Sequence, residues 1–353
     1  SKVNFVVKYF TKQNQMFSME LQDLEKNDRK CMYKTYDKWP EIAKESFEEK
    51  FNKINVEGID HIIFAGMGGS GSLGDTISAI LSKKDIHVTN VKGYLLPKTV
   101  DAKTLVIASS VSGNTAEVLS ILNNVKKTNA TAIGFSSGGL VEKYCRNEKI
   151  YFQNIPMVHS PRASFTKFLF SILNVLEPIL PIKKNDVNDS IYSLEKIRKN
   201  ISSENLTKGN KALELAEFVR DIICIYYPGG FQSAAIRYKN CLQENAKIHA
   251  MTEDIIESSH NGIVAWEKKS NVKPVLIRGV DDHIKTIERG NILKKFFDMN
   301  NIDYKVVNSV EGNILTKITS LIYLLDYSTL YTAVINNTDP SPVNSIDFIK
   351  SEL

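Results

Sequence analysis

Hydroxyl and amide side chains gather in one short segment, SSVSGNTAE, which begins at Ser109. It follows the apolar run KTLVIA and leads into the helical pattern NTAEVLSILNNVKK, so these side chains lie where a strand ends and a helix begins. The first turn of a helix has unpaired N–H groups and the positive end of the dipole, both of which favour an anion. The residues concerned are Ser110, Ser112, Asn114 and Thr115.

One Ser, Thr or Asn is enough to cap a helix. Four of these residues in the six positions 110–115 are more than a cap needs. We therefore favour a site for the phosphate of a small substrate over a simple helix cap. The lysine of a nucleotide-triphosphate loop is missing from this segment, which argues against a nucleoside triphosphate.

A glycine-rich turn, GMGGSG, follows the buried strand pattern HIIFAG at residues 66–71. It formally matches the dinucleotide fingerprint GxGxxG, in which glycines let the backbone approach a pyrophosphate. That fingerprint also needs an acidic residue after the next strand, and DIHVTNVKGY offers only Asp85, before it. A tight turn with close helix packing is the other explanation. The motif by itself leaves both open.

Both turns belong to a regular alternation of strand and helix patterns. The strand patterns are continuous apolar runs, which indicates strands covered on both faces and therefore a parallel sheet with crossover helices. The polar segment PIKKNDVNDS, residues 181–190, is expected to be a break, after which the pattern restarts. In the second unit, FQSAAIRYKNCLQENAKIHAM, residues 231–251, is expected to form one long helix. The sequence thus predicts an α/β fold with two successive units of similar architecture. The expected regions are an N-terminal helical segment (1–58), two domains (59–190 and 205–335) and a C-terminal tail (336–353).

Composition excludes several classes of protein. The chain has 353 residues and a formal net charge of only +5, with both signs spread along it. This pattern does not favour nucleic acid, and we expect no membrane-spanning segment. The four cysteines form no CxxC pair, which suits a reducing compartment, and the apolar run at the N-terminus is short for a signal peptide. We expect a cytoplasmic protein.

Taken together, the motifs resemble a known family. Strands ending in GxGGSG and SxSGNT are similar to those of sugar isomerase (SIS) domains. Two such units in tandem resemble the phosphoglucose isomerase superfamily, and within it the bifunctional phosphoglucose/phosphomannose isomerases. The similar segments are GMGGSGSLGD, SSVSGNTAE, SPRASF, RYKNCLQENAK, SSHNGIVAWE and DPSPVNSIDFIK, between residues 66 and 350. Val111 departs from the family, which usually has tyrosine there.

The resemblance implies a role for each matched position. Glu244 would be the catalytic base, and Arg162 would stabilise developing negative charge. His260 and Lys350 would help to open the sugar ring, the histidine coming from the neighbouring subunit of a homodimer. The remaining residues would bind the substrate: Ser110, Ser112 and Thr115 its phosphate, and Gly68, Gly69 and Ser70 its sugar.

The chemistry of aldose–ketose isomerisation fits these residue types. A carboxylate can move a proton between C2 and C1 through a cis-enediolate, and arginine offers a permanent charge to that intermediate. By residue type alone, Glu244 would be a solvated helix glutamate paired with Lys247, and His159 would rival His260. A lysine so near a C-terminus is normally solvated, yet IDFIK reads as a helical turn. We therefore expect the tail to dock with the ammonium of Lys350 reaching the sugar.

The main hypothesis is a cofactor-free, metal-free isomerase acting on glucose 6-phosphate, mannose 6-phosphate and fructose 6-phosphate. A non-catalytic SIS module that senses a phosphosugar is the alternative. Such a sensor would need the phosphate-binding turn but not Glu244, His260 and Lys350 together. An NAD-dependent dehydrogenase is disfavoured because the acidic residue is missing. The clustered ligands of a zinc-dependent phosphomannose isomerase are also missing from the sequence.

Overall fold

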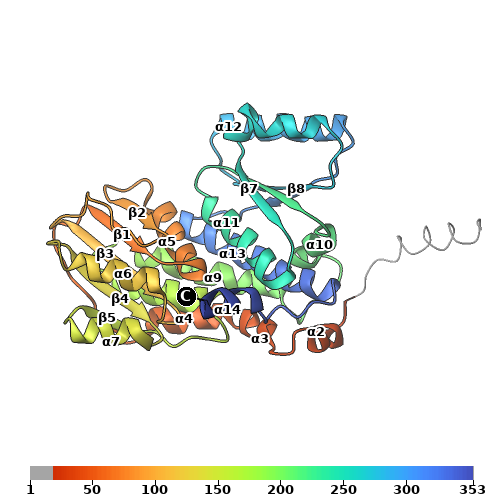
Figure 1. Cartoon of the computed structure of the whole chain (residues 1–353). Helices are drawn as coiled ribbons and strands as arrows, with labels where there is room; N and C mark the ends of the chain where they lie inside the picture. Colours follow the sequence, from red (N-terminus) through yellow and green to blue (C-terminus); the bar gives the residue numbers. More distant parts are fainter. Residues whose placement is uncertain (1–18, 353) are drawn as a thin grey trace, which may run out of the picture.

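Two parallel β-sheets organise the chain (Figure 1), and the computed structural model describes residues 19–352. The first sheet has the strand order β2-β1-β3-β4-β5, with every neighbouring pair parallel. Its strands are β1 (His61–Ala65), β2 (His87–Val91), β3 (Thr104–Ser110), β4 (Thr131–Ser136) and β5 (Tyr151–Asn154).

Helices cover both faces of this first sheet. Along β1 the side chains alternate between the faces, because successive residues of a strand point in opposite directions. Ile63 packs with Ile121 and Val125 of α6 on one face, while Ile62 and Phe64 face the large central core. The helices around the sheet are α5 (Gly68–Leu81), α6 (Ala116–Val125), α7 (Gly139–Asn147) and α8 (Phe165–Val175).

The second sheet, also fully parallel, has the order β7-β6-β8-β9. On one face Tyr226 and Leu276 pack against Phe297 of α12, and on the other Ile225 and Val275 join the central core. Its strands are β6 (Ile223–Tyr227), β7 (Ala250–Asp254), β8 (Lys273–Arg278) and β9 (Lys305–Asn308). The helices of this half are α9 (Lys184–Ile201), α10 (Lys211–Phe218), α11 (Gln232–Cys241), α12 (Ile284–Met299) and α13 (Ile314–Ile335). Short helical turns span Leu242–Ala246, Glu257–His260 and Gly262–Glu267, and α14 (Asn344–Ser351) ends the described chain.

Helix α13 lies at the centre of the molecule. It is long and apolar enough to cross a membrane, which was not expected from the sequence. However, 89% of its most apolar window is buried within the protein. That burial identifies α13 as a core helix, packed against α9, α10 and α11.

Three short helices precede the first sheet and pack beneath the central core. The Trp39 indole donates to the carbonyl of Ala163 at 3.1 Å and stacks on Tyr323 of α13 with ring centroids 5.4 Å apart. The Tyr36 hydroxyl donates to Asp326 of α13 at 3.3 Å. This segment therefore contacts both halves of the chain. Its helices are α2 (Leu21–Asn27), α3 (Met32–Asp37) and α4 (Trp39–Glu48); the part of the predicted helical segment before residue 19 lies outside the described residues.

The prediction of an α/β fold with two parallel sheets is confirmed, but three local expectations are wrong. Residues 181–190 are not a break, because α9 begins at Lys184. The long helix expected over 231–251 ends early, since Lys247 adopts a left-handed conformation with φ 57°. Residues 250–254, which were expected partly within that helix, form β7 at an edge of the second sheet.

Candidate active site

The two polar turns of the sequence meet at one point of the first sheet. β1 and β3 are neighbours, and the chain continues from β1 to the strand on its other side. In an open parallel sheet such a reversal leaves a crevice at the carboxyl ends of the two strands, where ligands bind. The glycine-rich turn follows β1 and the hydroxyl-rich turn follows β3, so both border this crevice.

The hydroxyl-rich turn is arranged around Ser110. Its Oγ lies 2.7 Å from Oγ1 of Thr115 and accepts a hydrogen bond from the N–H of Gly113 at 3.0 Å. Thr115 is the N-cap residue of α6, yet its side chain makes no capping hydrogen bond. The N–H groups of the first turn of α6 are therefore left without the usual side-chain acceptor. This geometry fits an anion site better than a simple cap.

Gly113 makes the sharp bend of that turn. Its φ is +74°, and a Cβ atom there would lie 1.9 Å from the carbonyl oxygen of Gly138. Both the left-handed backbone and the close approach require glycine. The turn is thus locked against the loop after β4, which fixes where Ser110 and Thr115 point.

The glycine-rich turn mainly brings backbones close together. Ser70 is 5% exposed, and its Oγ accepts from the N–H of Val111 at 3.2 Å, which joins the two turns. A Cβ at Gly69 would lie 3.2 Å from the carbonyl oxygen of Pro161, so α5 begins directly against the Arg162 segment. Between the two explanations left open by the sequence, these contacts favour close packing.

Glu244 and Arg162 come together from opposite halves of the chain. Arg162 precedes α8, and its Nη1 lies 3.3 Å from Oε2 of Glu244. Glu244 sits in the π-helical turn Leu242–Ala246 that follows α11, and such turns are frequent at functional sites. The Glu244 side chain is 25% exposed and the Arg162 side chain only 4%, so the carboxylate can reach a ligand while the arginine is buried behind it.

The donors of Arg162 are nearly all used by the protein. Nε donates to Oδ1 of Asn245 at 2.6 Å, and Nη2 donates to the carbonyls of Pro340 and Ser341 at 2.6 and 3.2 Å. With the contact to Glu244, four of the five guanidinium N–H groups have partners among the described residues. The fifth belongs to Nη1, the nitrogen that faces Glu244.

The buried ion pair between Arg237 and Asp326 supports the main chain of Arg162. Nη2 of Arg237 donates to the carbonyl of Arg162 at 2.7 Å and to Oδ2 of Asp326 at 2.6 Å. The guanidinium also lies 4.2 Å from the centre of the Phe165 ring. Burial raises the pKa of Asp326, and the charge of Arg237 opposes that shift. Removing either partner would leave an unpaired charge in the core.

An open cleft of about 690 Å³ lies beside Glu244. Its size is within the usual range for a small-molecule site. Among the predicted sugar-binding residues, Gly68 lines this cleft together with Glu244. The other lining residues are Asn240, Gln243, Lys247, Ile248, His249 and residues 342–346 of the tail.

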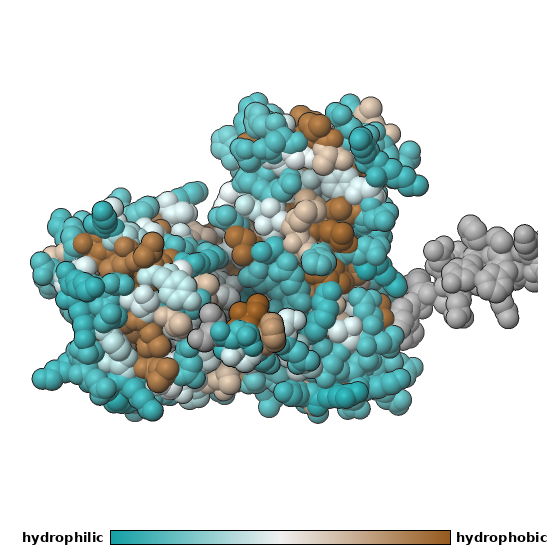
Figure 2. All heavy atoms as spheres, in the orientation of Figure 1, coloured by the Kyte–Doolittle hydropathy of each residue, from teal (hydrophilic) through white to brown (hydrophobic). Residues whose placement is uncertain are grey.

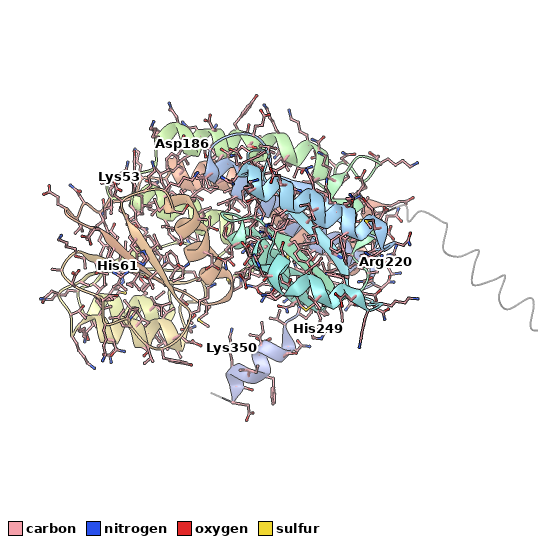
Figure 3. All side chains as sticks on the ribbon, turned by 90° about the horizontal axis from the view of Figure 1, so that it is seen from above. Lys53, His61, Asp186, Arg220, His249 and Lys350 are labelled. Carbon is pink, nitrogen blue, oxygen red and sulfur yellow. The ribbon has the colours of Figure 1, made fainter. Side chains whose placement is uncertain are left out.

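Within the single chain, His260 and Lys350 do not line the cleft that contains Glu244. His260 ends a short 3₁₀ turn and is exposed. Lys350 lies on α14, which has no buried residue and projects from the body on the side of His249 (Figure 3). The apolar side chains of α14 are exposed and form a brown patch at the front of Figure 2. The rival His159 is held in the fold, with Nε2 3.1 Å from the carbonyl oxygen of Lys30.

Sequence reasoning missed Asn245 and misread Lys247. Asn245 is fully buried, and its Nδ2 donates to Thr329 at 2.7 Å while its Oδ1 holds Arg162. A helical pattern hides this role, because the π-turn changes which residues face the core. Lys247 donates to the main-chain carbonyl of Glu244 at 2.6 Å and makes no ion pair with the Glu244 carboxylate in the described structure. Glu244 is therefore not the solvated half of a helix ion pair.

Comparison with known families gives a match for residues 208–353, to the model described as "Bacterial phospho-glucose isomerase C-terminal SIS domain". The chain is 30% identical to a bifunctional phosphoglucose/phosphomannose isomerase of Caldicellulosiruptor bescii, over 91% of this chain and 98% of that protein. It is 29% identical to a protein of the same description from Aquifex aeolicus, over 89% and 94%.

Solved structures show the same architecture. The C-terminal domain of glucosamine-fructose-6-phosphate aminotransferase from Francisella tularensis superposes with a TM-score of 0.65 at 17% identity. The match covers 87% of this chain and 96% of that one. At this identity the likeness speaks for the fold alone, and it agrees with two SIS-type units in tandem.

Proposed function

Since this chain belongs to the family of bifunctional phosphoglucose/phosphomannose isomerases, we propose that its cleft beside Glu244 is where a hexose 6-phosphate is isomerised. The chain is an aldose–ketose isomerase that interconverts glucose 6-phosphate and mannose 6-phosphate with fructose 6-phosphate. The observation that carries the site assignment is the pairing of Glu244 with Arg162 across the two halves. Such a reaction serves glycolysis and gluconeogenesis.

The phosphate of the substrate binds at the start of α6. The uncapped N–H groups of that helix and the hydroxyls of Ser110, Ser112 and Thr115 supply donors without adding charge. The sugar extends from there along Gly68, Gly69 and Ser70 toward Glu244. Gly68 supports this path because it lines the cleft that contains the carboxylate.

Glu244 moves the proton. Its carboxylate takes the proton from C2 of the open-chain aldose and returns it to C1, which yields the ketose through a cis-enediolate. The remaining N–H of Arg162 lies on the nitrogen beside Glu244 and stabilises the negative charge on the enediolate oxygens. Asn245 accepts from that guanidinium, and the Arg237–Asp326 pair holds the main chain of Arg162.

Ring opening is assigned to His260 and Lys350, acting at the ring oxygen and its neighbouring hydroxyl. Both side chains are exposed in the single chain, which is compatible with a homodimer in which a neighbouring subunit supplies His260. We further propose the functional units 59–190 for phosphate binding, 205–335 for the base, and 336–353 as a tail that completes the site. The enzyme would act in the cytoplasm without metal or cofactor.

The experiment is direct observation of turnover. Purified protein is mixed with fructose 6-phosphate in D₂O, without nucleotide or metal, and followed by ¹H and ³¹P nuclear magnetic resonance. We expect glucose 6-phosphate and mannose 6-phosphate to appear, with deuterium at C2 of both products, because the proton on Glu244 exchanges with solvent. Binding of fructose 6-phosphate without any conversion would instead favour the phosphosugar sensor.

A further inference from the structure

Lys247 stands at a strained corner directly after the turn that carries Glu244. Its φ is 57° and its ψ 35°, a left-handed conformation that residues with a Cβ seldom adopt. The backbone N–H of Lys247 bonds to the carbonyl of Leu242, which closes the π-turn. The left-handed backbone of Lys247 therefore marks the point where the helix ends.

The ammonium of Lys247 lies among five main-chain carbonyl oxygens. Two of them, from Glu244 and Asn245, belong to the catalytic turn, at 2.6 and 3.5 Å from Nζ. The other three belong to the C-terminal tail: Asp339 at 3.2 Å, Pro340 at 3.4 Å and Pro342 at 2.9 Å. An ammonium has three hydrogens and no acceptor, so it is well suited to join two groups of carbonyls. This contact links the tail to the turn that holds Glu244.

The tail segment is built to be held in this way. In the sequence DPSPV, Pro340 and Pro342 have no N–H group, so they interact with the rest of the protein only through their carbonyls and rings. Arg162 also donates to the carbonyl of Pro340. Two cations therefore share one turn of the tail, one from each half of the chain.

The helix α14, which comes after this tail segment, is otherwise weakly attached. It buries none of its residues, while its approach and first turn, residues 342–346, form one wall of the cleft beside Glu244. The position of that wall, and of Lys350 further along α14, depends on how residues 339–342 are fixed. Although the Lys247 residue as a whole is exposed, burial around the ammonium lowers its pKa, with the charge of Arg162 adding to the effect.

We propose that Lys247 is a positioning residue for the isomerase reaction, which fastens the C-terminal tail to the catalytic turn and so holds the tail wall of the cleft against Glu244. Lys247 borders the cleft, but its ammonium is taken up by main-chain carbonyls of the catalytic turn and of the tail, so we assign it an effect through residues 339–346. This inference rests on the proposed role of Glu244.

The test combines two changes and their double variant. One is Lys247→Met, which keeps the side-chain length without the donors, and the other is a chain that ends after Thr338. We expect Lys247→Met to lower kcat about 10- to 100-fold with KM changed less than about 3-fold, because a wall displaced by about an ångström disturbs orientation rather than phosphate binding. In the shortened chain, adding Lys247→Met should have no further effect, since the three tail carbonyls through which Lys247 would act are gone.

Hydrogen–deuterium exchange gives a readout independent of activity. The amides of residues 343–352 should exchange at least about 10-fold faster in Lys247→Met, with thermal unfolding of the body unchanged. Lys295→Met, at an exposed position on α12, is the matched control and should alter neither quantity. Unchanged kcat and unchanged exchange in Lys247→Met would overturn the proposal, as would an equal additional loss in the shortened chain. If the wild type itself fails to isomerise, the proposed function fails, and the exchange arm still decides whether Lys247 holds the tail.

Discussion

The two sheets have the same reversal of strand order but different chemistry at it. In the first, β1 and β3 end in turns where the Ser110 hydroxyl accepts the N–H of Gly113. In the second, β6 and β8 occupy the matching positions, and the N–H of Gly279 donates at 2.9 Å to the carboxylate of Asp282. A neutral acceptor leaves the first turn open to an anion, whereas a carboxylate makes the second one unsuitable for phosphate.

We infer from this difference that the two similar halves have different roles in the proposed reaction. Nε of Arg278, at the end of β8, lies 3.8 Å from the carboxylate of Asp282, so the reversal in the second sheet is closed by its own ion pair. The second half contributes instead the π-turn after α11, with Glu244. The site we propose is therefore not repeated in each half. It lies between a phosphate-binding half and a proton-transferring half.

Glu244→Gln should give the largest effect, because it removes the proposed base and leaves the proposed phosphate site intact. We expect kcat for fructose 6-phosphate to fall about 10³- to 10⁴-fold, while the Kd measured by calorimetry stays within a few-fold. Glu288→Gln, at an exposed position on α12, is the control and should keep full activity. Substantial turnover in Glu244→Gln would show that the second half does not supply the base.

The matched pair Gly113→Ala and Gly230→Ala compares the two halves by stability. At Gly113 the left-handed backbone and the overlap with the Gly138 carbonyl together should cost about 3 to 4 kcal/mol. At Gly230, with φ +95° and nothing within 4 Å of a Cβ, only the backbone cost of about 1 to 2 kcal/mol should remain. Urea unfolding measures both free energies. Equal losses would contradict the idea that the first turn is the more tightly constrained one.

Weakened phosphate binding is expected next in size. Ser110→Ala combined with Thr115→Val should raise the KM for fructose 6-phosphate about 10- to 100-fold, as expected for lost hydrogen bonds to a charged group, with kcat changed much less. Asp282→Asn in the second half serves as the contrast and should leave KM unchanged, since we place no substrate contact at that turn. A KM effect of Asp282→Asn as large as that of the double variant would remove the distinction.

Chelation should have no effect. Among residues 19–352 there is no group of three or more His, Cys, Asp or Glu side chains placed to hold a metal ion. We expect kcat to be the same after dialysis against EDTA as before, measured with both glucose 6-phosphate and mannose 6-phosphate. If EDTA abolished activity and added Zn²⁺ or Mg²⁺ restored it, the enzyme would have to contain a metal site that neither half forms by itself.

Local patterns in the sequence were enough to predict much of the fold and part of the candidate site. The strands at β1 and β3 and the turns after them follow from apolar runs and hydroxyl-rich segments, which are local signals. The position at which α11 ends could not be predicted from such local patterns. The left-handed Lys247 and the π-turn before it are stabilised by carbonyls of residues 339–342 and by Arg162, and these contacts join positions about 80 to 95 residues apart.

The same limit applies to the tail. Its helical turn was predicted from IDFIK, and α14 is present. The docking of Lys350 at the sugar, which that pattern also suggested, remains a prediction. The contacts that hold the tail are to main-chain carbonyls, which every residue type supplies. Side-chain identity therefore gave no signal for them.

The helices before β1 have a practical consequence for anyone who wishes to shorten this enzyme. Trp39 supports the Arg162 segment through Ala163, and Tyr36 reaches the carboxylate that holds Arg237. A trimmed version that starts at the first strand would keep every residue that we propose to contact the sugar, yet it would expose to water the aromatic side chains that Tyr36 and Trp39 cover. We expect such a truncated enzyme to aggregate before it could be assayed. Protein engineers should therefore keep residues 19–48, because they support the segment that carries Arg162.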